Sequence, residues 1–268
     1  MTTNEPQIIC PSCRRGRLAA ETEGKLYCDQ CDAAFNVNNR VIDLLPDFDY
    51  KPSRGQQLME WSPLTEMYES RWWRKSGLFT LMTGIGFDDE YKMIVGALKL
   101  NGDELLLDLA CGPGIFSRPL ARLLDRGRVV GLDLSGPMLN YAGRKARDQE
   151  IGNLTLVHGS ALDLPFPDNE FDRINCCGAV HLFPDIPKAL SEIFRTLKTN
   201  GIFTTAVFRN WLPGATSRKI ADWQYRKWGV KIFQPVEIQS LLIDVGFTVF
   251  TFLHSKRYWQ IAGAVKSG

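Results

Sequence analysis

The chain has 268 residues, of which 44% are hydrophobic, so it is long enough for one sizeable core and a small additional domain. Its formal net charge of +2 is too small to indicate a nucleic-acid-binding protein by itself. No apolar run approaches the roughly 20 residues that a membrane-spanning helix needs. The first residues show no charged-then-apolar leader pattern, so we expect a cytoplasmic protein.

Four of the seven cysteines lie near the N-terminus in two C-x2-C pairs. They are Cys10, Cys13, Cys28 and Cys31. Each pair can place two thiolates on one ion, and two pairs complete the tetrahedral set that zinc prefers. Two disulfides would use the same residues, but they are rare in cytosolic proteins. Residues 1–46 are therefore predicted to form a zinc ribbon with a closed, structural metal site.

The predicted ribbon is nearly neutral, since residues 10–31 carry four basic and three acidic side chains. A module that follows a phosphate backbone is usually more basic. A small domain that braces the fold or a partner is therefore favoured over a nucleic-acid reader. Residues 47–60 are polar, and residues 62–87 are aromatic-rich with helical tendency. Residues 47–100 are accordingly assigned to a linker and a helical N-terminal cap.

The segment LLLDLACGPGIFSRPLA, Leu105 to Ala121, combines a strand, a glycine turn and a helix. Its first five residues are apolar except Asp108, as in a buried parallel strand. Gly112 and Gly114 allow the backbone to approach a ligand, and the helix predicted over 115–125 offers free N–H groups at its start. This combination forms the ligand-binding corner of an open α/β sheet. A plain strand-to-helix turn is the alternative.

A second corner follows about one βα unit later, in VVGLDLSGPMLNYA. Asp133 ends its apolar strand, where a carboxylate can accept hydrogen bonds from both hydroxyls of a ribose. An adenine dinucleotide and S-adenosylmethionine both carry such a ribose. The dinucleotide pattern G-x-G-x-x-G needs a third glycine, but Ser117 stands there. Asp108 before the turn also suits a cationic ligand better than a pyrophosphate, which favours S-adenosylmethionine.

From about Asp103 onward, the sequence resembles the class I S-adenosylmethionine-dependent methyltransferases. DLACGPG matches their glycine motif, and GLDLSGPML matches their ribose motif. HGSALDLPFPDNEFDRI, 158–174, is similar to their adenine-contacting segment, and ALSEIFRTLKTNGIF, 189–203, to the helix and fifth strand that follow. The resemblance implies an α/β fold in residues 101–268, with a seven-stranded Rossmann-like sheet of order 3-2-1-4-5-7-6 that ends in antiparallel strands.

The resemblance also implies which residues bind the cofactor. In the four motifs they are Asp108, Ala110, Gly112, Gly114, Asp133, Leu134, Met138, Ser160, Ala161, Leu162 and Cys177. Ser160 stands where many members have an acidic residue that contacts the adenine amine. Relatives also cover the methionine end of the cofactor with a tyrosine and a Trp-Arg pair, to which Tyr68 and Arg74 correspond. A basic surface helix with buried tryptophans is the alternative for these two.

The stretch DRINCCGAVHLFPD follows the predicted fourth strand and contains the candidate general base, His181. Histidine can take a proton from a hydroxyl or an activated carbon. A packing residue at a helix start is the alternative, because methyl transfer to carbon or oxygen can proceed by proximity alone. Methyltransferases that act on nucleobase nitrogens often carry Asn-Pro-Pro-Tyr here. Cys176 and Cys177 open a Cys-Cys-Gly-Ala segment instead, and they are expected to be small strand residues.

Residues 209–235 form an insertion after the predicted fifth strand. In the methyltransferase fold that the sequence resembles, an insertion at this position lies over the acceptor pocket. Residues 209–231 carry a net charge of +5. The aromatic residues are Trp211, Trp223, Tyr225 and Trp228. Three of them, Trp211, Trp223 and Trp228, are predicted to contact the acceptor. The aromatics indicate a flat or apolar acceptor, and the charge indicates a carboxylate, a phosphate or RNA. A basic amphipathic helix packed on the sheet is the alternative.

The order of ribbon, IDLLP segment and motifs resembles a bacterial and plastid branch of small-molecule methyltransferases, near the ubiquinone and menaquinone C-methyltransferases. The ribosomal RNA guanine-N1 methyltransferases share a zinc ribbon and an LLP segment, and there the ribbon helps to grip RNA. The favoured function is methyl transfer to carbon or oxygen of a small aromatic or conjugated acceptor that can be anionic. RNA methylation and a non-catalytic binding subunit are the alternatives. The sequence names neither the acceptor nor the oligomeric state.

Overall fold

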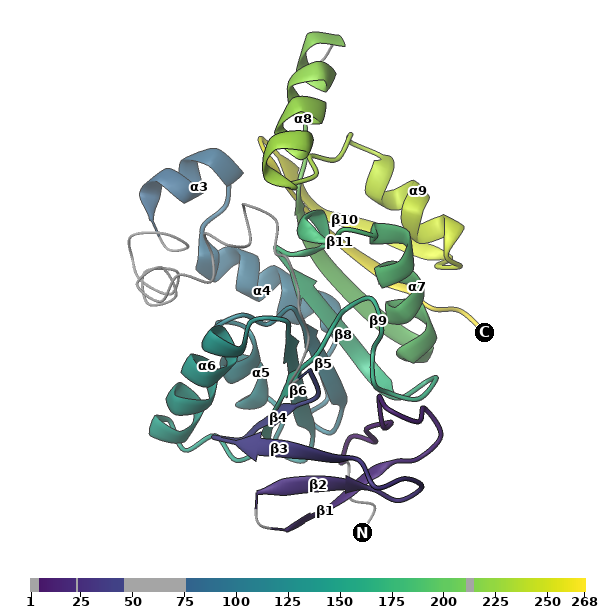
Figure 1. Cartoon of the computed structure of the whole chain (residues 1–268). Coiled ribbons are helices and arrows are strands. Elements are labelled where there is room, and N and C mark those ends of the chain that lie inside the picture. The colour runs from purple at the N-terminus through teal and green to yellow at the C-terminus, as the bar shows by residue number, and fades with distance from the viewer. Residues whose placement is uncertain (1–4, 23, 46–75, 211–214) are drawn as a thin grey trace.

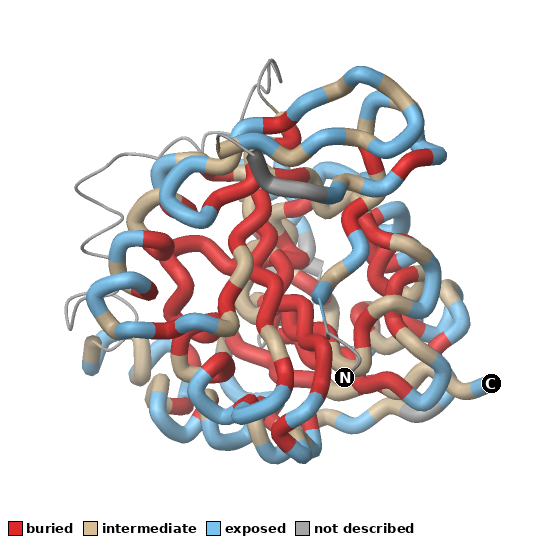
Figure 2. Tube along the Cα trace, turned by 90° about the horizontal axis from the view of Figure 1, so that it is seen from below, coloured by how far each residue is buried: buried red, intermediate tan, exposed pale blue. Residues whose placement is uncertain are grey.

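The computed structural model describes residues 5–22, 24–45, 76–210 and 215–268. These residues form one twisted sheet with helices on both faces (Figure 1). Buried positions concentrate along the central strands, and exposed ones lie mainly in the outer helices and loops (Figure 2). No helix within the described ranges is long and apolar enough to cross a membrane.

Five parallel strands form the centre of the sheet. They are β5 (Leu105–Leu109), β6 (Arg128–Asp133), β7 (Leu154–His158), β8 (Phe171–Cys177) and β9 (Leu197–Phe208). In β5, Leu105 and Leu107 belong to the apolar cluster on one face, whereas Leu106 belongs to the cluster on the other. Because both faces are covered, the strand is apolar almost throughout, as predicted.

Helices cover the two faces unequally. One face packs against α4 (Phe87–Leu98), α5 (Ser117–Ala121) and α6 (Gly136–Asp148), and the other against α7 (Ile186–Thr196) and α9 (Glu237–Asp244). The helix predicted over 115–125 is shorter, since α5 ends at Ala121 and Leu123 is exposed. The chain turns after it because the N–H groups of Arg126 and Gly127 donate to Gly102 O.

Three further helical segments lie near the carboxyl ends of the central strands. They are α3 (Gly77–Thr83), the 3-10 turn η1 (Val180–Leu182) and α8 (Ala215–Trp228). Helix α8 lies within the predicted insertion 209–235, and it projects away from the sheet (Figure 1).

The C-terminal strands are β10 (Val249–Lys256) and β11 (Trp259–Val265), and β11 lies antiparallel between β9 and β10. Counted from β5 as the first strand, the seven strands up to β11 follow the order 3-2-1-4-5-7-6. This part of the sheet ends in antiparallel strands, as expected.

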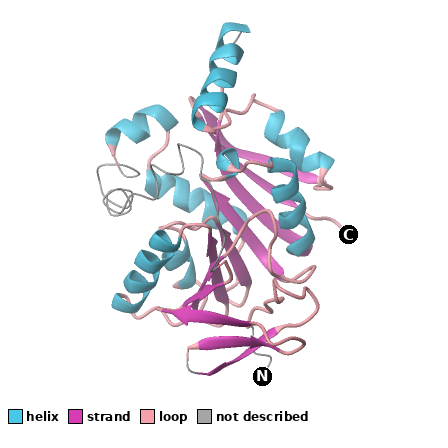
Figure 3. Ribbon diagram, viewed as in Figure 1, coloured by secondary structure: helices cyan, strands magenta, loops and turns pink. Residues whose placement is uncertain are grey.

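Short strands form the described part of the N-terminal ribbon (Figure 3). They are β1 (Leu18–Thr22), β2 (Lys25–Cys28), β3 (Ala34–Asn38) and β4 (Val41–Asp43). Strand β4 pairs in parallel with β7, so the ribbon continues the main sheet. The prediction of a seven-stranded sheet is therefore wrong for the sheet as a whole, in which the described residues form 11 strands. The domain boundaries after residues 46 and 100, and the cap insertion 209–235, stay predictions.

Candidate cofactor pocket and cysteine cluster

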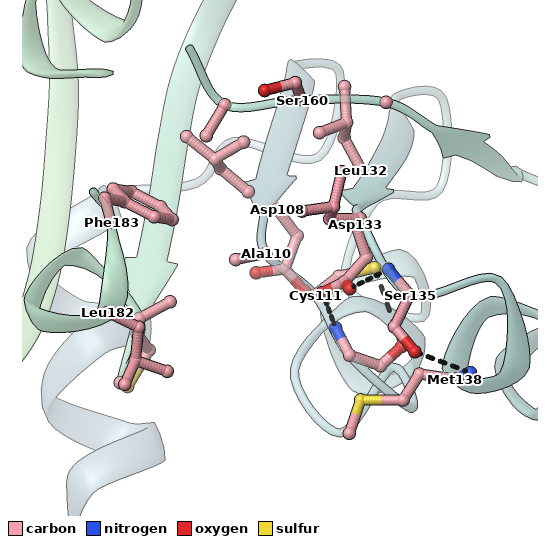
Figure 4. Close-up of a pocket in the computed structure, with 18 of the residues that line it drawn as sticks. Asp108, Ala110, Cys111, Leu132, Asp133, Ser135, Met138, Ser160, Leu182 and Phe183 are labelled. Atoms are coloured by element: carbon pink, nitrogen blue, oxygen red, sulfur yellow. Dashed lines mark hydrogen bonds between the residues drawn. The ribbon is translucent and has the colours of Figure 1, made fainter. Parts of the chain in front are cut away.

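A cavity of about 250 Å³ opens where β5, β6 and β8 end. Ten residues that the motifs predicted line it: Asp108, Ala110, Gly112, Asp133, Leu134, Met138, Ser160, Ala161, Leu162 and Cys177. Figure 4 shows Leu182 and Phe183 on one side of the cavity and Asp133, Ser135 and Met138 on the other. Carboxyl ends of parallel strands are the usual ligand-binding side of open α/β sheets.

The glycine turn after β5 brings backbone to the wall of the cavity. Ala110 and Gly112 both have positive φ angles, of 55° and 53°. Ala110 therefore holds a conformation that side-chain-bearing residues rarely adopt, and such strain is common at ligand-binding sites. Gly114, with φ 78°, does not line the cavity. A Cβ at Gly114 would lie 3.2 Å from Ala142 Cβ, so this glycine allows close packing of helix α6.

Asp133 is fixed by the loops on either side of it. Its Oδ2 accepts a hydrogen bond from Gly112 N at 2.7 Å, and its Oδ1 accepts one from Ser135 N at 2.8 Å. Burial raises the pKa of Asp133, while these two N–H donors act in the opposite direction. A carboxylate has about four acceptor sites, so both oxygens can still accept bonds from ribose hydroxyls.

Asp108 is a second carboxylate in the wall of the cavity, and it is almost fully buried. It accepts a hydrogen bond from Asn175 Nδ2 at 2.7 Å and another from the Ser117 hydroxyl. Burial raises the pKa of Asp108 to about 6, and the negative charge of Asp133 adds to the rise. A bound cation would lower the pKa of Asp108 again. The two carboxylates therefore fit a ligand that carries a sulfonium and an ammonium group.

The remaining wall is apolar. It includes Ala179, Leu182 and Phe183 after β8. Sequence reasoning missed Leu182 and Phe183, although an apolar pair shortly after the fourth strand was a usable signal. Ser160 lies at the predicted adenine side, where its hydroxyl accepts a hydrogen bond from Leu162 N at 3.2 Å and shapes the turn.

The candidate base His181 lies behind the cavity and does not line it. The residue is 2% exposed, and its ring packs edge-on against Phe208, with centroids 4.7 Å apart, and lies 6.2 Å from Trp259. Its backbone oxygen accepts a hydrogen bond from Lys231 N at 2.7 Å. This placement matches the packing alternative, and the catalytic role stays a prediction.

The predicted acceptor-contacting tryptophans are only partly described. Trp223 and Trp228 lie on α8, are 51% and 41% exposed, and do not line the cavity. Lys227 Nζ lies 4.7 Å from the ring centre of Trp223 and 5.4 Å from that of Trp228. Trp211, and the cofactor candidates Tyr68 and Arg74, fall outside the described residues.

The four ribbon cysteines come together at one point. Their Sγ atoms all lie within 4.8 Å of one another. Cys10 and Cys31 are 3.8 Å apart at sulfur, and Cys13 and Cys28 are 3.6 Å apart. Tetrahedral zinc with Zn–S bonds of about 2.3 Å separates its sulfur ligands by about 3.8 Å. The cluster therefore fits a zinc ion.

Residues 106–201 match the family model described as a methyltransferase domain. The chain contains a methyltransferase domain. The predicted enzyme class, a methyltransferase, is thereby confirmed, whereas its acceptor and its location in the cell stay predictions.

Two relatives indicate how far this methyltransferase resembles known proteins. It is 27% identical over 269 residues to an uncharacterized chloroplastic methyltransferase of Arabidopsis thaliana, covering 91% of this chain and 74% of that protein. It is 35% identical over 105 residues to the demethylmenaquinone methyltransferase of Oceanobacillus iheyensis. That match covers 39% of this chain and 44% of the relative, so the chain spans less than half of that protein's length.

Solved structures agree on the fold. A SAM-dependent methyltransferase from Aquifex aeolicus superimposes with a TM-score of 0.59 at 17% identity. The superposition covers 76% of this methyltransferase and 98% of that chain. At this identity the likeness supports the fold alone.

Proposed function

We propose that the chain transfers a methyl group from S-adenosylmethionine to carbon or oxygen of a small, apolar, conjugated acceptor. The observation that carries the proposal is the composition of the cavity. One wall holds two carboxylates, the buried Asp108 and the partly exposed Asp133, and the other wall is formed by Leu182 and Phe183. A cationic cofactor suits the first wall and an apolar acceptor suits the second.

When bound, S-adenosylmethionine supplies a methyl group on a positively charged sulfur. Asp133 would accept hydrogen bonds from the ribose, and the turn at Gly112 would bring backbone against the ligand. The segment from Ser160 to Leu162 would surround the adenine. Asp108 would place negative charge beside the cationic end, which compensates the unfavourable burial of its own charge.

The residues of the apolar wall have two tasks in this proposal. Leu182 and Phe183 exclude water from the acceptor and hold it in line with the transferred methyl group. Alignment of this kind can supply a large part of the rate enhancement without a general base. The burial of His181 behind the cavity is compatible with such a mechanism.

The exposed aromatics of α8 support a role in covering the acceptor. Trp223 and Trp228 stand on a helix close to the end of the sheet that carries the cavity (Figure 1). Demethylmenaquinone methyltransferases, named for a conjugated ring acceptor, are among the relatives. The basic residues of α8 would also suit RNA, which remains the second candidate.

Binding and turnover measurements test the proposal. We expect calorimetry to show tighter binding of S-adenosylmethionine than of NAD, and tighter NAD binding would overturn the cofactor assignment. Methyl transfer from labelled cofactor is then measured with hydroxylated aromatic compounds and with ribosomal RNA. RNA that binds through about six phosphate contacts should lose roughly 10³-fold affinity or more between 50 and 200 mM salt. Such a slope together with RNA methylation would overturn the small-molecule assignment.

We further propose that the cysteine cluster binds one structural zinc ion. The support is the spacing of the four sulfur atoms and the position of Gly16, whose N–H donates to Cys13 Sγ at 3.3 Å. N–H donors of this kind stabilise thiolates. With four protein ligands, the ion would have no open position for catalysis.

A further inference from the structure

The ribbon packs against strands β6 and β7, and the loops that follow these two strands line the cavity. Ile42 and Leu44 of the ribbon belong to the same apolar cluster as Leu132 of β6 and Val157 of β7. Parallel pairing of β4 with β7 places Asp43 beside His158. The N–H group of Leu44 also donates to His158 O at 3.2 Å. The last strand of the ribbon therefore lies directly beside His158, the last residue of β7.

His158 joins the ribbon to the ribose loop through its side chain. Its Nδ1 lies 2.7 Å from Asp43 Oδ1, and its Nε2 lies 3.0 Å from Leu134 O. Both partners are hydrogen-bond acceptors, so the ring lies as a bridge between the ribbon and the loop that follows β6. Leu134 lines the cavity and directly follows Asp133. A displacement of β4 would therefore also displace the loop that carries Asp133, the carboxylate that we expect to hold the ribose.

A second connection reaches the adenine side of the cavity. The Arg14 guanidinium donates two hydrogen bonds to the Asp163 carboxylate, and Ile9 N donates to Pro165 O at 2.8 Å. Arg14 directly follows Cys13, one of the four clustered cysteines, and Asp163 directly follows Leu162, which lines the cavity. The two connections hold both cofactor loops from the side of the ribbon.

We propose that the ribbon and the cofactor pocket are energetically coupled, with Asp43 and His158 as positioning residues. Folding of the ribbon around its cysteine cluster then raises cofactor affinity. By thermodynamic reciprocity, cofactor binding stabilises the ribbon by the same factor. The inference rests on the proposed function, because S-adenosylhomocysteine is the ligand of the test.

Hydrogen exchange of the full chain with and without saturating S-adenosylhomocysteine tests the coupling. In the wild type we expect slower amide exchange in residues 105–138, which line one part of the pocket, and also in the ribbon, residues 5–45, where the slowing is about tenfold. In Asp43→Ala the pocket amides should still slow, but the ribbon amides should change by less than about twofold. Calorimetry should show an affinity about tenfold lower in Asp43→Ala than in the wild type.

Three further variants separate this coupling from general damage. Asp43→Asn keeps an oxygen acceptor for His158 and should restore most of the coupling. Asp163→Ala removes the second connection at a half-exposed site, so it tests the coupling even if Asp43→Ala does not fold. Asn36→Ala, at an exposed position of β3, should behave as the wild type.

The outcomes separate the two proposals. If the pocket amides slow in the wild type while the ribbon amides do not, the coupling is overturned and the proposed function stands. Equal slowing of the ribbon in wild type, Asp43→Ala and Asp163→Ala would also overturn it. If the ligand fails to protect the pocket itself, the proposed function fails.

Discussion

Asp133 is the residue on which the cofactor assignment depends most. We predict that Asp133→Ala weakens binding of S-adenosylhomocysteine by at least about 1 kcal/mol, the least expected for lost hydrogen bonds to a ribose. Its contacts with Gly112 N and Ser135 N are lost as well, so the glycine turn also loosens. Calorimetry measures the effect. Asp148→Ala, at the exposed end of α6, is the matched control, and equal affinity of the two variants would contradict the assignment.

Asp108 makes cofactor binding depend on pH. Burial raises its pKa to about 6 from an ordinary value of 3.8, so the folded chain binds this proton more tightly than the unfolded chain does. Its contribution to stability is thus fully present below pH 3.8 and is lost as the pH rises through about 6. Binding of a cation shows the opposite trend, because it needs the ionised carboxylate.

We therefore predict that affinity for S-adenosylmethionine falls as the pH drops below about 6, by up to about tenfold per pH unit. Calorimetry at pH 5 to 8 measures the profile, with Asp108→Asn as the comparison. The variant should lose this dependence. A wild-type profile as flat as that of the variant would show that Asp108 does not interact with the cationic part of the ligand.

His181 tests whether the reaction uses a general base. Since its ring packs against Phe208 and near Trp259, we predict that His181→Phe keeps turnover within about tenfold of the wild type, below the usual effect of removing a base. His181→Ala should instead lower the free energy of unfolding by about 2 kcal/mol or more, as in other large-to-small core changes. Denaturant unfolding and steady-state kinetics separate these effects. A larger loss of turnover in a stable His181→Phe chain would support the catalytic role.

At the scale of elements, helix α8 is the element that we expect to cover the acceptor. We predict that Trp223→Ala combined with Trp228→Ala abolishes turnover and leaves cofactor affinity unchanged, because both rings are exposed and neither lines the cavity. Lys219→Ala, on the same helix, should retain most of the turnover with an uncharged acceptor. Normal turnover without the two tryptophans would assign α8 to another task.

Some elements could be predicted because their signal is local. Strands β5 and β6 are apolar runs that end at a glycine turn and at Asp133, and ten pocket residues follow from the motifs. The pairing of β4 with β7 had no such signal, since Asp43 and His158 are far apart in the sequence. The burial of His181 depends on Phe208 and Trp259, which come from β9 and β11. Tertiary contacts of this kind leave no periodic pattern around the residue itself.

At the scale of the whole molecule, the cysteine cluster decides whether the N-terminal part folds. We predict one zinc ion per chain in reduced protein, and loss of that ion in the double variant Cys10→Ser with Cys28→Ser. Removing the ion should melt the ribbon, because so short a segment cannot supply its own core. Metal analysis and circular dichroism measure both effects. Cys177→Ser, outside the cluster, should retain the metal, and disulfides among the four cysteines would contradict the prediction.

The pairing of β4 with β7 also bears on aggregation. Strand β7, with the sequence LTLVH, is largely buried and apolar, and β4 occupies its backbone hydrogen-bonding groups on one side. A chain that began at residue 76 would leave that side open, and an unpaired apolar strand of this kind is a template for strands of other molecules. The ribbon then protects the sheet as a folded neighbour within the same chain. Without the ribbon, the exposed side of β7 would be available to pair with a second copy of the protein, which would favour self-association.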